Sequence, residues 1–201
     1  MKFKFILCAV GASALAAGCF NEPVPAERVV PKEARVYLTG KGLSDLSAQR
    51  AVLRPEVVDY VNLDHNSLTN VDEVASLENL KWLRLNDNRL TRLPNLSKLV
   101  KLRRIYIARN QFAEVPAELK ELPQLESIDL SDNPIAAIPA WLAEKKGLLH
   151  LSLNRTRIRK LPADLSAWQT LKTLQLGDLT LEDPSDYARI RAALPNTAVV
   201  Y

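Results

Sequence analysis

The chain has 201 residues, of which 47% are hydrophobic and 25% are charged, and its formal net charge is +4. This is an ordinary globular composition with enough apolar residues for one substantial core. Lys2 and Lys4 lie in the first 18 residues, which contain no acid, so the remainder carries a net charge of only +2. Such a weak positive charge speaks against a nucleic-acid-binding protein.

The first twenty residues, MKFKFILCAVGASALAAGCF, differ from the rest of the chain. The uncharged run over 5–17 is shorter than the roughly 20 residues of a membrane span, and it is typical of the apolar core of a secretory signal. The ending LAAGC resembles the lipobox of bacterial lipoproteins, although Ala16 stands where that family usually has leucine. The resemblance implies a signal peptide over 1–18 and lipidation of Cys19, which would anchor the protein in the lipid bilayer.

The N-terminal segment also allows another interpretation, and it bears on the membrane in which the protein would lie. Cleavage after Ala14-Leu15-Ala16 would instead release a soluble periplasmic or secreted protein. If Cys19 is lipidated, the following Phe20, which is not an aspartate, implies the outer membrane in the Gram-negative sorting convention. Residues 19–30 are polar and contain prolines, and we expect them to tether the domain to the lipid. The only other cysteine, Cys8, lies in the signal, so the mature domain would have neither a disulfide nor a cysteine metal site.

Residues 31–56 are expected to form an N-terminal cap. In RVYLTGKGLSDL, which begins at Arg35, Val36 and Leu38 alternate with polar residues and are predicted to be inward strand residues. Residues 44–54 are then predicted to form a helix that ends before Pro55.

Residues 57–181 contain six copies of the pattern L-x-x-L-x-L-x-x-N-x-L, for example LKWLRLNDNRL from Leu80 and LESIDLSDNPI from Leu125. Its asparagine column is Asn66, Asn88, Asn110, Asn133, Thr156 and Leu179, with spacings of 22, 22, 23, 23 and 23 residues. These copies resemble the leucine-rich repeats of small bacterial lipoproteins. The resemblance implies an α/β leucine-rich-repeat solenoid, a horseshoe arc with a parallel β-sheet on its concave face and short helices or 3-10 turns on its convex face.

Each column of the repeat has a physical reason. Alternating leucines predict a short strand with one buried face, and stacked copies bury leucines that one repeat could not bury alone. The asparagine can hydrogen-bond backbone groups of the turn that follows. Thr156 can keep part of that role and Leu179 cannot, so the asparagine ladder should end there. In the return segments, Trp168 is expected in the core and Trp141 on the outer face.

Residues 182–201 are expected to form a C-terminal cap. Ser185 or Asp186 can cap a helix that runs through Leu194. Pro195 and Asn196 end it before a terminal strand with the sequence AVVY. Terminal repeats of a solenoid must shield an open core, so degenerate copies are expected at both ends.

The chain contains no recognisable catalytic constellation. The motifs HExxH and GxSxG, a phosphate loop and paired cysteines are all absent from the sequence. His65 and His150 fall in different repeats and different columns, and the pair Asp64-His65 is expected to be a solvated turn. We therefore predict a non-enzymatic protein without a cofactor or a metal.

The two outward columns of the strands carry the strongest signal for binding. The first reads Arg35, Tyr60, Trp82, Arg104, Ser127, His150 and Thr173, and the second reads Tyr37, Asn62, Arg84, Tyr106, Asp129, Ser152 and Gln175. Because neighbouring strands lie about 4.8 Å apart, the aromatic and arginine side chains of the first four repeats should form one patch. Its members, Arg35, Tyr37, Tyr60, Trp82, Arg84, Arg104 and Tyr106, have the composition of interface anchors.

Several interpretations of this patch remain open. The aromatic and arginine side chains could pair across strands only for stability. If they bind, the resemblance favours a protein or peptide ligand, and an envelope glycan is the alternative, with arginines meeting its acidic groups. A structural scaffold of the envelope and a secreted adhesion or virulence factor are further alternatives. Trp82 buried in the core would exclude the binding patch.

Overall fold

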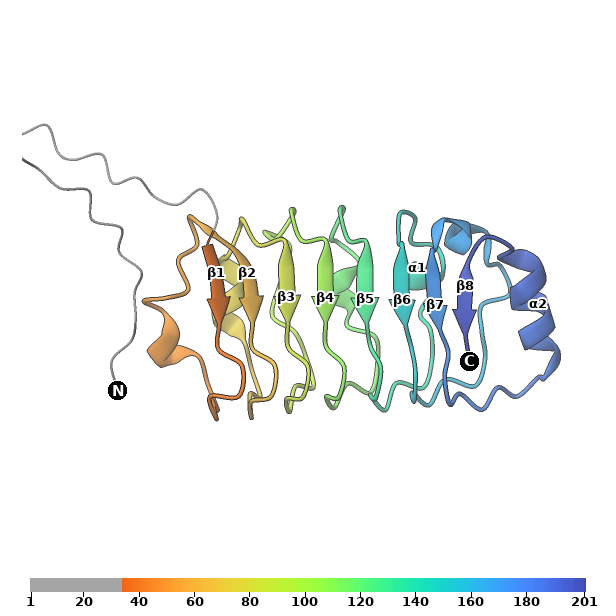
Figure 1. The fold of residues 1–201 in the computed structure, drawn as a ribbon, viewed down its shortest axis with the longest axis horizontal. Helices are drawn as coiled ribbons and strands as arrows, with labels where there is room; N and C mark the ends of the chain where they lie inside the picture. The colour runs from red at the N-terminus through yellow and green to blue at the C-terminus, as the bar shows by residue number, and fades with distance from the viewer. Residues whose placement is uncertain (1–33) are drawn as a thin grey trace, which may run out of the picture. The chain divides into compact units, whose positions relative to one another are not determined.

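In the computed structural model, residues 34–201 are described, and they form one sheet of eight parallel strands in the order β1 to β8 (Figure 1). The strands are β1 (Ala34–Tyr37), β2 (Val58–Asn62), β3 (Trp82–Arg84), β4 (Arg104–Tyr106), β5 (Ser127–Asp129), β6 (His150–Ser152), β7 (Thr173–Gln175) and β8 (Ala198–Val200). The expected signal peptide, Cys19 and the tether lie outside the described residues, as do residues 31–33 of the expected cap.

One buried residue in each strand from β2 to β7 forms the inner face of the sheet. Val61, Leu83, Ile105, Ile128, Leu151 and Leu174 pair in register and are at most 2% exposed. This is the period of two that the alternating leucines predicted. Successive copies therefore share one continuous core, and the predicted solenoid with a parallel sheet is confirmed.

The return segments contain only short helices. They are the 3-10 helices η2 (Asp72–Ser76), η3 (Ala117–Leu119) and η4 (Ser166–Thr170) and the four-residue helix α1 (Ala140–Ala143). Leu119, Leu142 and Trp168 point into the core from these helices and are fully buried. Trp168 donates a hydrogen bond from Nε1 to the carbonyl of Leu142 over 3.0 Å, as a buried indole requires. Trp141 is half-buried and packs against the core, so it lies less far outward than its column suggested.

The asparagine ladder is present and ends where the sequence loses it. Asn110 donates from Nδ2 to three carbonyls, including that of Leu85, and its Oδ1 accepts from the backbone N–H of Leu90 over 3.0 Å. Asn88 and Asn133 repeat this arrangement. Thr156 keeps one bond, from Oγ1 to the carbonyl of Leu153 over 2.9 Å.

The two terminal segments differ from expectation in their details. Instead of a helix over 44–54, the chain forms a single 3-10 turn, η1 (Ser47–Gln49), followed by a turn in which the carbonyl of Gln49 accepts from the N–H groups of Val52 and Leu53. The helical bonds do not continue to Pro55, which has no N–H to donate. At the other end, the N-cap position of α2 (Ser185–Ala193) is Pro184, and Oδ1 of the preceding Asp183 accepts from the backbone N–H of Ser185 over 2.8 Å. Neither Ser185 nor Asp186 is the capping residue. Pro184 lies at the start of α2, where proline is tolerated.

The final strand of the sheet follows this helix. The predicted terminal strand is β8, and the Tyr201 ring packs edge-on against Tyr187 at 5.1 Å. Among the described residues, no helix is both long and apolar enough to cross a membrane.

Candidate functional site

The strand register brings the members of each outward column side by side, although Ser127 and Ser152 are buried. Tyr60 pairs with Trp82, and Trp82 pairs with Arg104, while Arg84 pairs with Tyr106 in the second column. Trp82 is 37% exposed, so it lies on the open face of the sheet and outside the core. Tyr37 is 59% exposed, Arg35 is exposed, and Tyr60, Arg84, Arg104 and Tyr106 are half-buried. All seven predicted residues therefore lie on one face of the neighbouring strands β1 to β4 (Figure 1).

Four of these side chains form a continuous row across the strands. The ring centroids of Tyr37 and Tyr60 are 5.2 Å apart, and those of Tyr60 and Trp82 are 5.8 Å apart, both in tilted geometry. The Arg104 guanidinium lies 4.3 Å from the centroid of the Trp82 ring. Such distances are those of favourable aromatic and cation–π contacts. Within residues 34–201, no carboxylate lies within ion-pair distance of Arg104, so its charge is available to a ligand.

Arg84 is held differently from Arg104. Its Nε and Nη2 lie 2.7 and 2.6 Å from Oδ2 of Asp64, and its guanidinium lies 5.5 Å from the Tyr106 ring. Asp64 is only 2% exposed and its Oδ1 also accepts from the backbone N–H of Asn86 over 2.8 Å. The expectation that Asp64 lies in a solvated turn was wrong, because the aspartate follows a buried strand residue and lies beneath Arg84. Arg84 therefore serves the structure first, and Arg104 is the better candidate for binding.

Comparison with family models identifies the repeat. Residues 78–117 match the model described as Leucine Rich repeats (2 copies), and residues 124–144 match the model described as Leucine Rich Repeat. The chain therefore contains leucine-rich repeats. No curated protein matches it.

Basic residues surround Trp82 and Arg104, at one end of the row. A shallow pocket of about 450 Å³ is lined by Trp82, Gln124 and Glu126 and by four cations, Lys81, Lys101, Arg103 and Arg104. Two of these cations are paired with carboxylates, Lys81 with Asp59 and Arg103 with Glu126, each over 3.4 Å. The Nζ of Lys101 donates to Oδ1 of Asn79. Leucine-rich-repeat domains generally bind proteins or peptides. In this chain, the pocket beside the exposed Trp82 has more cationic than acidic side chains in its lining.

The C-terminal half of the open face satisfies its own polar groups. Ser152, which is buried, bonds to Ser131 over 2.6 Å and donates to Oε1 of Gln175 over 2.7 Å. Asn154 donates to the same oxygen over 3.2 Å. With small and mutually bonded side chains, this half offers fewer anchors than β1 to β4, as the change in column composition indicated.

A further feature of the structure, a column of residues with alternating charge, was not predicted from the sequence. Six residues just before the asparagine column have a positive φ between 51° and 59°, namely His65, Asp87, Arg109, Asp132, Arg155 and Asp178. Each Nη2 of Arg109 and Arg155 lies within 2.8 Å of a carboxylate one repeat earlier, on Asp87 and Asp132 respectively. These hydrogen bonds hold the pKa of both aspartates below their ordinary value. This column could have been predicted from the sequence, because acidic and basic residues alternate at the position just before the asparagine column.

Among residues 34–201, no group of three or more histidine, cysteine or acidic side chains could hold a metal ion. His65 pairs with Asp87, with Nδ1 2.9 Å from Oδ2, and His150 lies four strands away on β6.

Proposed function

We propose that this protein is a non-enzymatic binding module whose open sheet face takes an acidic segment of a partner protein. The single observation that carries the proposal is the row Tyr37, Tyr60, Trp82 and Arg104, which ends in a guanidinium without a carboxylate partner among the described residues. Exposed tyrosine, tryptophan and arginine are the residue types that dominate binding energy at interfaces. The cations around Trp82 favour a ligand with negative charge.

A peptide fits this row better than a glycan does. Sugar rings stack on a free aromatic face, but Tyr60 and Arg104 lie on opposite sides of Trp82 in the strand order and contact its ring. What Trp82 offers a ligand is therefore its edge, against which peptide side chains can pack. The Arg104 guanidinium beside it can form a bidentate bond to a carboxylate.

We further propose that Cys19 is lipidated and holds the module at the cell envelope, in the outer membrane. The support is the LAAGC sequence after an apolar run that is too short to span a membrane. Labelling cells with an alkyne fatty acid tests this anchor. We expect label on the wild-type protein and none on Cys19→Ser, and an unlabelled wild-type protein would remove the anchor while leaving the binding proposal intact.

Site-specific photocrosslinking in cells tests the binding face. A photoreactive amino acid in place of Tyr37, which is 59% exposed, should capture a defined partner. The double variant Trp82→Ala/Arg104→Ala should lose that crosslink, whereas His150→Ala/Thr173→Ala, two positions of the same column on β6 and β7, should retain it. Circular dichroism of all variants verifies folding. Equal crosslinking by both double variants would overturn the proposal.

A further inference from the structure

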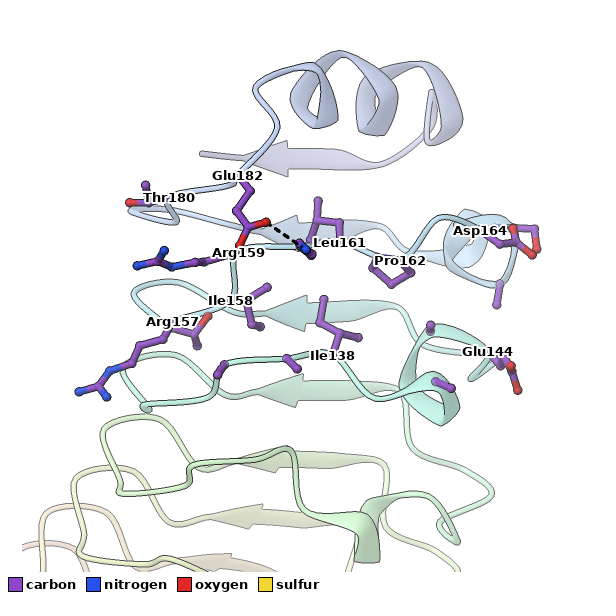
Figure 2. A pocket seen from close by; sticks show the side chains of 18 of the residues that line it. Ile138, Glu144, Arg157, Ile158, Arg159, Leu161, Pro162, Asp164, Thr180 and Glu182 are labelled. Carbon is purple, nitrogen blue, oxygen red and sulfur yellow. Dashed lines mark hydrogen bonds and ion pairs between the residues drawn. The ribbon is translucent and has the colours of Figure 1, made fainter.

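A second concave site lies on the side of the repeats opposite the open sheet face. It is a groove of about 1130 Å³ lined by residues of three successive return segments, within 136–146, 156–167 and 178–182. Figure 2 shows these segments in front of the strands, with Ile138, Ile158, Leu161 and Pro162 in the middle of the groove. Its volume is above the roughly 300–1,000 Å³ of small-molecule sites.

The groove exists because one repeat has small side chains at two positions. Ala136 and Ala137 follow Ile135, and the same two positions hold Thr91 and Arg92 in the repeat of β3 and Arg159 and Lys160 in that of β6. The next position is buried in the other repeats, at 2% exposure for Leu93, 5% for Val115 and 8% for Leu161. Ile138 at this position is only half-buried. A core position is thus left uncovered by two alanines.

The two ends of the groove differ in charge. In Figure 2 Arg157 and Arg159 project together from one side, while Glu144 and Asp164 lie at the opposite side. Within the part of the chain that is described, neither Arg157 nor Arg159 has a carboxylate within ion-pair distance. Two acids that also line the groove are paired with other cations: Glu182 lies 3.1 Å from Lys160, and Asp178 lies 3.7 Å from Arg155. Lys146 also lines the groove and offsets one of the acids at the other end.

We propose that this groove binds an extended peptide segment of a partner protein, independently of the open sheet face. The segment would place an acidic side chain between Arg157 and Arg159, small apolar side chains over Ala137 and Ile138, and a basic side chain near Glu144 and Asp164. A lipid headgroup or another polyanion matches only the arginine end and is repelled by the two carboxylates at the other. The opposite charges at the two ends therefore select a polypeptide that carries an acidic and a basic side chain a fixed distance apart.

Panning a phage-displayed library of random dodecapeptides on the full-length protein tests this proposal. We expect selected peptides to carry an acid and a base on opposite sides of a short apolar stretch. Ala137→Arg, which installs the residue that Arg92 provides in the repeat of β3, should weaken these peptides at least tenfold. Arg157→Glu/Arg159→Glu should abolish their preference for an acid and select a base there instead. Arg89→Glu, in the column of Arg157 but three repeats away, should change nothing.

Two further measurements make the outcome decisive. Trp82→Ala/Arg104→Ala should still bind the selected peptides, so failure of the open-face proposal and failure of this one are separable. Thermal unfolding should show that Ala137→Arg is folded, as expected for a substitution at an exposed position. Absence of any enriched charge pattern, or peptides that bind Ala137→Arg as well as wild type, would overturn the proposal. Binding to phosphatidylglycerol vesicles that depends on Arg157 and Arg159, without peptide binding, would also overturn it in favour of a lipid site.

Discussion

Arg109 donates a hydrogen bond from Nη2 to Oδ2 of Asp87, 2.7 Å away and one repeat earlier, and both residues have a positive φ. Arg155 and Asp132 repeat the arrangement two strands later. This backbone conformation is unfavourable for residues other than glycine, so each turn of the column destabilises the fold slightly. Ion pairs between successive turns offset part of that cost and link repeats on the edge where the strands end.

The charged column makes stability depend on pH on the acid side. Arg109 and Arg155 hold the pKa of Asp87 and Asp132 below the ordinary value of 3.8. The folded chain therefore binds these protons only at lower pH than the unfolded chain does, so the stabilisation is complete above pH about 4 and is lost as the pH falls through the folded values. Arg109→Gln should lower the free energy of unfolding at pH 7 by about 0.2–1 kcal/mol.

Urea unfolding of Arg109→Gln and wild type at pH 7 and at pH 2.5 measures this contribution. The two proteins should differ at pH 7 and converge at the lower pH. Arg89→Gln serves as the matched control, because Arg89 is exposed and forms no ion pair within residues 34–201. A difference between wild type and Arg109→Gln that is independent of pH would show that the arginine acts through packing.

Asn110 should be among the most sensitive polar positions. It is 7% exposed and satisfies three carbonyls and the N–H of Leu90. Asn110→Ala leaves those buried groups without partners and should cost about 1–3 kcal/mol or more. Asn110→Asp keeps the acceptor but loses the donor, so it should remain destabilised. Chemical unfolding measures both, with exposed Asn95→Ala as the control, and a loss no larger than that of the control would contradict the role of the ladder.

The two tryptophans of the return segments should behave differently. Trp168 is fully buried and bonded to Leu142, so Trp168→Ala should lower the free energy of unfolding by about 3–5 kcal/mol. Trp141 is half-buried, and Trp141→Ala should cost clearly less. Trp168→Phe fills most of the volume and separates the contribution of the indole N–H. Thermal and urea unfolding of the three variants decide the order, and equal losses for both alanine variants would refute it.

Arg84 and Arg104 lie on the same face of the sheet but should have separable roles. Arg84→Met removes the partner of the buried Asp64 carboxylate and should cost about 1–3 kcal/mol of stability. Arg104→Met removes only a cation–π contact, worth about 0.5–1 kcal/mol at an exposed site. Unfolding of both variants and of Asp64→Asn/Arg84→Met tests the difference. A larger loss for Arg104→Met would reverse the two assignments.

Most of the fold could be predicted from the repeat, but the roles of individual site residues could not. The spacing of leucines and asparagines suffices to place Trp82 and Arg104 on the open face, because strand side chains alternate between two faces. It does not distinguish Arg84 from Arg104, since that distinction depends on Asp64, which lies in the preceding repeat and was expected to be solvated. The groove beside Ile138 was missed for a similar reason, as two alanines have meaning only when the neighbouring turns are stacked.

The sequence by itself determined the elements that recur: the strand columns, the asparagine ladder and its end after Thr156. These features follow from the spacing of leucines and asparagines, which recurs in each repeat and can therefore be recognised without a structure. Only the tertiary structure decided which charges are neutralised, which aromatic faces are covered and where a core position is left open. Those properties arise between residues one repeat apart, when stacking brings side chains 22 or 23 positions distant to a few ångströms, as Asp87 and Arg109 show.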